Sequence, residues 1–244
     1  MSPPVPAPGA VLFDMDGVLV DSSSAHVQAW ARFLEDQGLP PPREGIRSLF
    51  GRRASEAVAT LLGTDADPDT TRSALQLLER YADALLDEYA PGELLIAGVE
   101  QLVQRLADAG WRLAVATSAR RRAAEHSLGE LLTRFDTVVT AEDVARGKPD
   151  PEVYLTAARR LAILPTSCIV VEDAVAGVEA GKRAGMHVVA VAGTAGPQRL
   201  REAGADVVVD HVAEVLPLLE GGDTEPNNRG SRCDAQPGGP DVRR

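Results

Sequence analysis

The sequence predicts an α/β protein, with a mostly parallel, Rossmann-like sheet and a small helical domain inserted after its first strand. Short apolar runs suited to buried strands alternate with amphipathic segments of helical period, which is typical of a parallel sheet with helices on both faces. Residues 21–92 break this alternation, because they contain helical patterns and no convincing strand. The expected strands are residues 10–14, 112–117, 136–140, 168–172, 187–192 and 206–209.

Three amphipathic helices are expected between the later strands. One carries apolar residues at helical spacing from Val99 and ends at Gly110. Asp150 and Pro151 match a helix cap followed by a first-turn proline, so a second helix begins there. The third spans residues 174–184 and stops before a glycine.

The helical insert of residues 21–92 is expected to form a cap domain. Because it follows the first strand, it lies over the carboxyl ends of the strands, where open α/β sheets bind ligands. Two apolar stripes predict its helices. They consist of Val27, Trp30, Ala31 and Leu34 in the first helix, and of Ala74, Leu77, Leu78, Tyr81, Leu85 and Tyr89 in the second.

The remaining boundaries follow from composition. Residues 10–20 and 93–220 carry the strands and therefore form the core domain. Residues 1–9 are rich in proline, and residues 221–244 carry glycine, proline, asparagine and charge with almost nothing to bury. We expect both ends to be disordered.

Charge and composition exclude several classes of protein. The formal net charge is −11, whereas nucleic-acid binding needs a basic surface. No apolar stretch approaches the ~20 residues of a membrane span, and the N-terminus lacks the features of a signal peptide. The two cysteines, Cys168 and Cys233, indicate neither a disulfide framework nor a zinc site. We expect a cytoplasmic monomer without nucleic-acid or membrane partners.

A pair of aspartates, Asp14 and Asp16, lies where the first expected strand gives way to a glycine turn. Residues i and i+2 of an extended chain point to the same side, so both carboxylates face one small space. Carboxylates this close repel each other, which indicates a bound cation or a shared proton. A calcium-binding EF-hand loop is excluded, because its fifth and twelfth positions hold Val18 and Ala25.

Three further polar signals lie at strand ends or in the loops beside them. These are Thr117-Ser118 after the second strand, Lys148 in a Gly-Lys-Pro-Asp-Pro loop, and Glu172-Asp173 at the end of the fourth strand. Carboxylate oxygens in this number suit Mg²⁺. A cation, a lysine and a hydroxyl could hold a phosphoryl group while a carboxylate attacks it.

Each signal alone also has an ordinary structural interpretation. An Asp-x-Asp pair can cap a turn, and Thr117-Ser118 could cap the next helix. Lys148 could be a solvated loop lysine, and Glu172-Asp173 could simply start a helix. The complete set, in this order along the chain, is what indicates chemistry.

The order and the local sequence resemble the haloacid dehalogenase superfamily, in its β-phosphoglucomutase-like branch with a helical cap. The resemblance covers about residues 10–215. It rests on Phe-Asp-Met-Asp-Gly-Val-Leu-Val-Asp-Ser from residue 13, Ala-Thr-Ser from residue 116, Gly-Lys-Pro-Asp-Pro-Glu-Val-Tyr from residue 147 and Val-Val-Glu-Asp-Ala-Val-Ala-Gly-Val-Glu-Ala-Gly from residue 170.

The resemblance implies a role for each core residue. Asp14 would be the nucleophile that becomes an aspartyl phosphate, and Asp16 would be the general acid and then the base. Thr117, Ser118 and Lys148 would hold phosphate oxygens. The Mg²⁺ ligands would be Asp14, Asp173 and the backbone carbonyl of Asp16, with Glu172 beside the ion directly or through water. Asp16 also separates this chain from the dehalogenating branch, which lacks an acid there.

The cap bears on the substrate. By the resemblance, His26 matches a histidine that mutases use near the sugar, and Arg52 and Arg53 match a loop of sugar and polyol phosphatases. The alternatives are a helix-surface histidine and a solvated loop. Mutases also carry a lysine on a later cap helix, whereas residues 21–92 contain none, and Arg80 is no secure substitute. This departure favours hydrolysis.

The sequence therefore predicts a Mg²⁺-dependent phosphoric monoester hydrolase acting on a small phosphorylated sugar or polyol through an aspartyl phosphate. The alternatives are a β-phosphoglucomutase-type isomerase and a phosphoglycolate-type phosphatase, which shares every core residue. A phosphonoacetaldehyde-type hydrolase would need a cap lysine, which this cap lacks. A non-catalytic sensor is disfavoured because all the expected catalytic residues are present.

Overall fold

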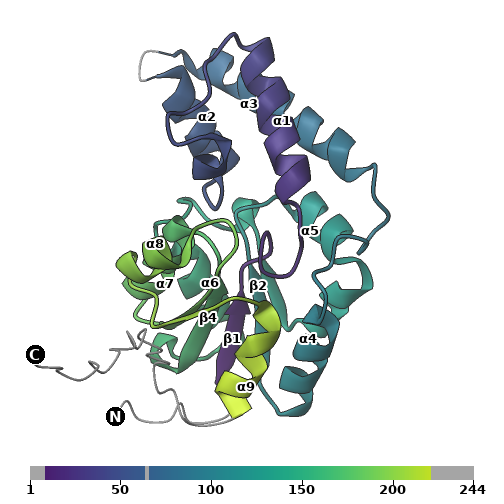
Figure 1. Cartoon of the computed structure of the whole chain (residues 1–244), viewed down its shortest axis with the longest axis vertical. Coiled ribbons are helices and arrows are strands. Elements are labelled where there is room, and N and C mark those ends of the chain that lie inside the picture. The colour runs from purple at the N-terminus through teal and green to yellow at the C-terminus, as the bar shows by residue number, and fades with distance from the viewer. Residues whose placement is uncertain (1–8, 64–65, 221–244) are drawn as a thin grey trace, which may run out of the picture.

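The computed structural model describes residues 9–63 and 66–220, and they form an α/β core beneath a layer of three helices (Figure 1). The expected disordered tail, residues 221–244, and residues 1–8 of the expected disordered N-terminus lie outside the described residues. In the described part of the chain, no helix is both long enough and apolar enough to cross a membrane.

The core is built on a six-stranded sheet in the order β3-β2-β1-β4-β5-β6, and every neighbouring pair is parallel. Each expected strand is confirmed, with bounds within about one residue of the prediction. The strands are β1 Ala10–Phe13, β2 Arg112–Ala116, β3 Thr137–Val139, β4 Cys168–Glu172, β5 His187–Val191 and β6 Val207–Val209.

The strand order decides where the polar residues meet. β1 lies between β2 and β4, so the carboxyl ends of these three strands share one edge of the sheet. Asp14 follows β1, Thr117 follows β2, and Glu172 ends β4. The chain leaves β1 towards β2 and β3 and later returns to the other side of β1 at β4. This reversal is the point at which open α/β sheets bind ligands.

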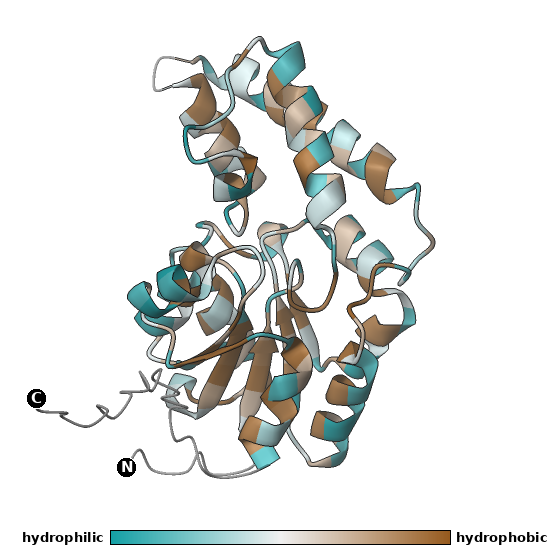
Figure 2. Cartoon of the chain, viewed as in Figure 1, coloured by the Kyte–Doolittle hydropathy of each residue, from teal (hydrophilic) through white to brown (hydrophobic). Residues whose placement is uncertain are grey.

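Side chains of β1 alternate between two apolar layers, as the two-residue period of a strand requires. Val11 and Phe13 pack with the helices on one face, and Ala10 and Leu12 pack with those on the other. The sheet is therefore buried on both faces, and Figure 2 shows its strands as the most apolar part of the core. The first face is covered by α4 Val99–Asp108, α5 Arg121–Leu128 and α9 Val215–Glu220, and the second by α6 Glu152–Leu161, α7 Val175–Arg183 and α8 Pro197–Glu202.

The three expected core helices are α4, α6 and α7, and the capping prediction at Asp150 differs from the structure by one position. The helix α6 begins at Glu152, with Pro151 in the cap position. The Asp150 carboxylate nevertheless accepts a hydrogen bond from the Glu152 backbone N–H at 3.0 Å. It therefore stabilises the start of the helix that precedes β4.

The inserted helices are α1 Ser23–Asp36, α2 Ala54–Leu62 and α3 Pro68–Leu86. They enclose an apolar core of their own, which includes Trp30, Phe33 and Leu78. The predicted stripe of α1 is partly wrong, because Ala31 is exposed and Phe33 is buried instead. The buried face of α1 differs from the predicted one because α1 packs against α3 and against the 3-10 turn Ile46–Leu49.

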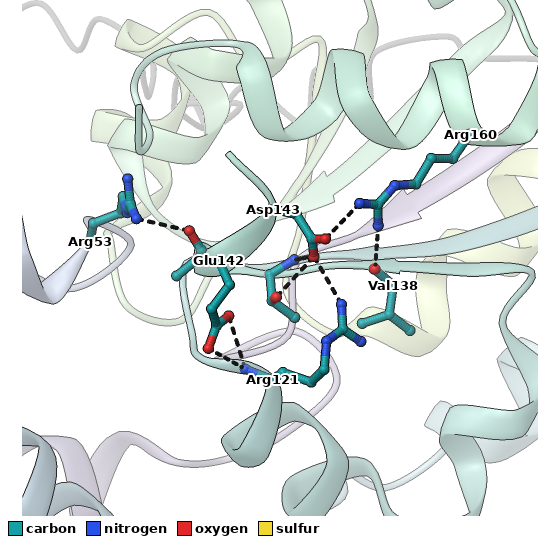
Figure 3. Close-up of polar contacts among 8 residues, drawn as sticks. Arg53, Arg121, Val138, Glu142, Asp143 and Arg160 are labelled. Atoms are coloured by element: carbon teal, nitrogen blue, oxygen red, sulfur yellow. Dashed lines mark hydrogen bonds and ion pairs between the residues drawn. The ribbon is translucent and has the colours of Figure 1, made fainter. Parts of the chain in front are cut away.

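The loop after β3 leads to Lys148 and is fixed by a polar network around Asp143 (Figure 3). The Asp143 carboxylate accepts hydrogen bonds from Arg160 at 2.6 Å, from Arg121 at 2.9 Å, and from the backbone and hydroxyl of Thr140, each at 2.9 Å. Burial would raise the pKa of Asp143, but the hydrogen bonds from Arg160 and Thr140 outweigh it and lower the pKa to about 2. The ionised carboxylate therefore organises this loop.

We expect Asp143→Ala to lower the free energy of unfolding by about 1–3 kcal/mol, because four donors lose their acceptor. Urea unfolding at pH 7 measures the change. Glu179→Ala is the control, since it removes only an exposed pair with Arg183 and should change stability by less than ~0.5 kcal/mol. Because the folded-state pKa of Asp143 is depressed, the effect should be complete above pH ~4 and fade as the pH falls towards 2. Equal losses in both variants would contradict this assignment.

Candidate active site

A buried lysine joins the two strands at the centre of the sheet. The Lys148 ammonium donates to Asp14 Oδ1 and to Glu172 Oε1, each at 2.7 Å. Asp14 extends from the end of β1 and Glu172 from the end of β4, and all three side chains are almost completely buried. Lys148 is therefore not a solvated loop lysine.

Glu172 is held at both carboxylate oxygens. Oε1 also accepts the Tyr154 hydroxyl at 2.9 Å, while Oε2 accepts the backbone N–H groups of Asp173 and Ala174 at 2.8 and 2.9 Å. A Cβ atom at Gly177 would lie only 1.6 Å from Oε1, so this turn of α7 leaves room for the carboxylate only because it holds a glycine. Glu172 therefore has a single orientation.

Asp173 extends beside the turn that follows β1. Its Oδ2 accepts the backbone N–H of Thr194 at 3.3 Å. Gly17 has φ +82°, and a Cβ there would lie 1.9 Å from the same oxygen. The glycine turn after the aspartate pair therefore serves two purposes: it permits the left-handed backbone and it admits the Asp173 carboxylate.

Asp14, Glu172 and Asp173 form a cluster that could hold a metal ion. One carboxylate oxygen from each lies within 4.8 Å of the others, and all three side chains are buried. Three ionised carboxylates and one ammonium leave an excess of two negative charges. A hard divalent cation with oxygen ligands fits both the charge and the donor set.

The pKa values of these groups show how the charges oppose one another. Burial raises the pKa of Asp14 well above its ordinary value, although Lys148 acts in the opposite direction. Burial and then Glu172 raise the pKa of Asp173 to about 7. Burial would lower the pKa of Lys148, but Asp14 and Glu172 outweigh it and raise the pKa, so the lysine stays charged. A cation among the carboxylates would favour their ionised forms.

Asp16 is separate from this cluster and faces the cap. The Ser22 hydroxyl donates to Asp16 Oδ1 at 2.5 Å, and His26 Nε2 lies 3.8 Å from the same oxygen. Ser22 immediately precedes α1, so the start of the first cap helix orients this carboxylate. The structure thus gives the two aspartates different surroundings, one bound by a lysine and one by cap residues.

Thr117 and Ser118 follow β2 beside the aspartates. The Thr117 hydroxyl accepts the backbone N–H of Ala119 at 3.0 Å, and the side chain is buried. The Ser118 hydroxyl donates to the carbonyl of Gly51, in the cap, at 3.1 Å. Both residues line the pocket described next, so each lies beside Asp14 and Asp16.

A pocket of about 150 Å³ lies between the core and the cap. Its lining includes Asp14, Asp16, Thr117, Ser118 and Asp173 from the core, and His26, Trp30, Arg52, Glu79 and Asp83 from the cap. Polar groups therefore converge at the core end, with apolar and charged cap side chains above them, as expected of a small-molecule site.

The two cap arginines that the sequence singled out lie in different places. Arg52 is exposed and lines the pocket. Arg53 does not line it, because its guanidinium donates to the carbonyls of Ala141 and Ala145 at 2.8 Å each (Figure 3 shows the first of these bonds). Arg53 thus joins the cap to the loop that precedes Lys148.

The sequence interpretation missed two residues that position the site. Tyr154 and Gly177 stood within the quoted motifs, but no role was assigned to either. The contact of Tyr154 with Glu172 depends on how α6 packs, which the sequence does not show. The sequence did contain a signal for Gly177. Glycine destabilises a helix, so a glycine in the first turn indicates a position where no side chain fits.

A family model and several curated relatives match most of this chain. The family model described as haloacid dehalogenase-like hydrolase matches residues 11–191. The chain belongs to this family. Both the resemblance stated from the motifs and the expectation of a hydrolytic enzyme are confirmed.

Curated relatives match most of the chain. Validoxylamine A 7'-phosphate phosphatase of Streptomyces hygroscopicus subsp. limoneus is 38% identical, over 84% of this chain and 94% of that protein. Hexitol phosphatase A of Escherichia coli is 34% identical, over 84% of this chain and 91% of that protein. β-Phosphoglucomutase of Bacillus subtilis is 32% identical, over 86% and 93%. The named phosphatases support the prediction of a phosphoric monoester hydrolase.

A solved structure shows the same fold. The crystal structure of β-phosphoglucomutase from Clostridium difficile superposes with a TM-score of 0.77, at 23% identity, and covers 88% of this chain and 96% of that one. At this identity the likeness concerns the fold alone. It confirms the predicted α/β architecture with its helical insert.

We expect Gly177→Ala to lower the free energy of unfolding by about 1–3 kcal/mol, because its Cβ would displace Glu172 or move α7. Gly196→Ala is the matched control, since a Cβ there meets nothing within 4 Å and its φ of −68° suits alanine. Urea unfolding of both variants measures the difference. A Gly177→Ala protein as stable as the control would show that Glu172 is not held tightly.

Proposed function

We propose that this protein is a Mg²⁺-dependent phosphatase that hydrolyses a small phosphorylated sugar or polyol through a phosphoryl group carried on Asp14. The observation that carries the proposal is the buried Asp14–Lys148–Glu172 arrangement, which lies at the core end of a pocket that also contains Asp16. Phosphoryl transfer depends mainly on positioning and charge neutralisation, and this arrangement provides both.

In the first step, a carboxylate oxygen of Asp14 attacks phosphorus while the bond from phosphorus to the substrate oxygen breaks. Asp16 donates a proton to that leaving oxygen, so the alcohol departs neutral. Lys148 holds Asp14 Oδ1 at 2.7 Å, which favours its ionised form and leaves Oδ2 as the attacking atom. Burial alone would favour the protonated, unreactive form of Asp14.

In the second step, Asp16 accepts a proton from water as the water oxygen attacks the phosphoryl group on Asp14. The bond from Asp14 to phosphorus breaks, inorganic phosphate leaves, and the Asp14 carboxylate is restored. The contacts of Asp16 with Ser22 and His26 hold it on the cap side of the pocket, where both the leaving oxygen and the water would lie. Thr117, Ser118 and Lys148 would bind the phosphoryl oxygens.

The metal ligands in this proposal are Asp14, Asp173 and the backbone carbonyl of Asp16, with Glu172 beside them. When bound, Mg²⁺ would neutralise charge on the transferred phosphoryl group. The carboxylate spacing and the excess of two negative charges support a divalent ion. The held geometry of Glu172 supports a role in orienting Lys148 and Asp173 more than direct ligation.

The cap supports a substrate with a short polar body. His26 and Arg52 line the pocket and would contact substrate oxygens, whereas the Arg53 contacts place it outside the proposed substrate set. The phosphatases at 34–38% identity are named for phosphates of a hexitol and of validoxylamine A, both polyhydroxylated molecules. A phosphoglycolate-type activity would use the same core residues on a smaller substrate.

A β-phosphoglucomutase-type isomerisation is the second candidate, because a relative of that name is 32% identical over most of both chains. Such an enzyme must grip a bisphosphate in two orientations. The cap of this protein, residues 21–92, contains no lysine, which favours release of phosphate to water.

We expect free phosphate to be the dominant product from sugar and polyol phosphates. The test incubates the enzyme and Mg²⁺ with β-glucose 1-phosphate plus a trace of the 1,6-bisphosphate, and with a panel of hexose, hexitol and short-chain acid phosphates. Asp14→Asn is the control and should turn over at least ~10³-fold more slowly. Glucose 6-phosphate forming faster than phosphate would establish the mutase activity instead. If the Asp14→Asn variant kept more than a tenth of wild-type turnover, Asp14 would be excluded as the nucleophile.

We expect a chelator to abolish activity and added Mg²⁺ to restore it. Asp173→Ala should raise the Mg²⁺ concentration for half-maximal activity at least ~10-fold, because one carboxylate ligand is lost. Titration of phosphate release with Mg²⁺ measures both effects. Asp210→Ala is the control, since that exposed aspartate is not among the carboxylates of the cluster. Full activity in excess chelator would exclude the metal.

A further inference from the structure

The cap side of the pocket carries a group of three charged residues that the reaction described above does not use. Glu79 and Asp83 project from α3 of the cap, and Arg120 follows β2 in the core. All three line the pocket, and each side chain is about 30% exposed. We call these residues the acidic triad.

The single arginine of the acidic triad is already paired. Arg120 Nη2 lies 2.7 Å from Asp83 Oδ1, and Arg120 Nε lies 3.5 Å from Glu79 Oε1. Asp83 Oδ1 also lies 3.0 Å from Nη1 of Arg122, which pairs with Asp87 outside the pocket. The five linked residues combine three carboxylates with two guanidiniums and carry a net charge of −1. Because each side chain is partly buried, solvent screens these charges less than it would at a fully exposed site.

The other cation among the pocket residues lies towards a different region. Arg52 also lines a neighbouring cleft, whose described lining residues include none of Glu79, Asp83 and Arg120. A substrate whose phosphate lies on Asp14 and whose far end reaches α3 therefore meets the acidic triad.

We infer that the acidic triad is a specificity filter that selects monophosphates whose end remote from the phosphate is uncharged or cationic, and rejects those with a second anionic group there. An added carboxylate or phosphate would face Glu79 and Asp83 and would have to displace one of them from Arg120. Hydroxyl and amino groups can instead donate to the two carboxylates. This inference rests on the proposed phosphatase function and extends it to the substrate class.

The same residues also join the cap to the core, so a test must separate specificity from cap attachment. α3 lies beside α5 of the core (Figure 1). Outside the pocket, Arg122 of α5 pairs with Asp87 at 2.9 Å. Arg122 also lies 3.0 Å from Asp83 Oδ1, so Asp87 belongs to the same charge network and cannot serve as a control. Glu44 of the cap pairs instead with Arg199 of α8 at 3.6 Å, and neither residue lines this pocket. Glu44→Gln therefore removes an ion pair between cap and core without changing the network, and it is the control for Glu79→Gln.

Two substrates isolate the charge at the remote end. Sorbitol 6-phosphate and 6-phosphogluconate differ only at carbon 1, which is a hydroxymethyl group in one and a carboxylate in the other. For the wild type, we expect kcat/KM for sorbitol 6-phosphate to be at least ~10-fold higher, since like charges at an interface are strongly unfavourable. As competing inhibitors of p-nitrophenyl phosphate hydrolysis, the two compounds should follow the same order, with the lower inhibition constant for sorbitol 6-phosphate. This measurement works even where turnover is slow.

The ratio of interest is kcat/KM for sorbitol 6-phosphate divided by kcat/KM for 6-phosphogluconate. Glu79→Gln should lower this ratio about threefold or more, mainly through better use of 6-phosphogluconate, because one negative charge is removed from the pocket. Asp83→Asn should act in the same direction and serves as a second variant if the first does not fold. Glu44→Gln should leave the ratio as in the wild type. A purely structural ion pair would alter stability in all three variants and the ratio in none.

Three results would overturn the inference. The first is equal or better use of 6-phosphogluconate by the wild type. The second is an unchanged ratio in both Glu79→Gln and Asp83→Asn, and the third is an equal shift of the ratio in Glu44→Gln. Failure of the proposed function looks different. In that case the wild type with Mg²⁺ releases no phosphate even from p-nitrophenyl phosphate, and both proposals fail together.

Discussion

The buried ion pairs of Lys148 are the interaction on which the rest of this structure depends. A lysine without solvent is stable in its charged form only between anions, and here Asp14 and Glu172 supply them. The pairs also hold together the ends of β1 and β4, the two strands that flank the reversal of strand order. Loss of one partner would leave an unpaired charge in the core, so the geometry of the site and the stability of the core are coupled.

The surrounding contacts keep that arrangement in one geometry. Tyr154 and two backbone N–H groups fix Glu172, and Gly177 leaves the room that it needs. The loop that carries Lys148 is held by Asp143 on one side, and Arg53 from the cap binds two of its carbonyls. The lysine is therefore positioned by residues from both the core and the cap.

The cap contributes differently to the two aspartates. Asp14 contacts core residues, whereas Asp16 is held by Ser22 and lies near His26, at the start of α1. This division suits one carboxylate that stays ionised and one that exchanges protons. The same helical layer contributes Glu79 and Asp83 to the lining of the pocket. Cap residues would thus influence both proton transfer and the choice of substrate.

The sequence by itself determined the α/β class, the strands and the polar residues that follow them. Short apolar runs have few alternatives when they alternate with amphipathic helices, and the motifs place acidic and hydroxyl residues at strand ends. Packing between distant segments decided the rest. Phe33 is buried and Ala31 exposed because α3 and the 3-10 turn Ile46–Leu49 pack against one side of α1. The motif resemblance assigned Arg53 to the substrate, and nothing in the sequence distinguished Arg120 from the other arginines. Only the fold shows that Arg53 binds core carbonyls and that Arg120 pairs with two cap carboxylates. Long, flexible side chains can bind groups that are far away in the sequence, so the local sequence pattern does not predict their partners.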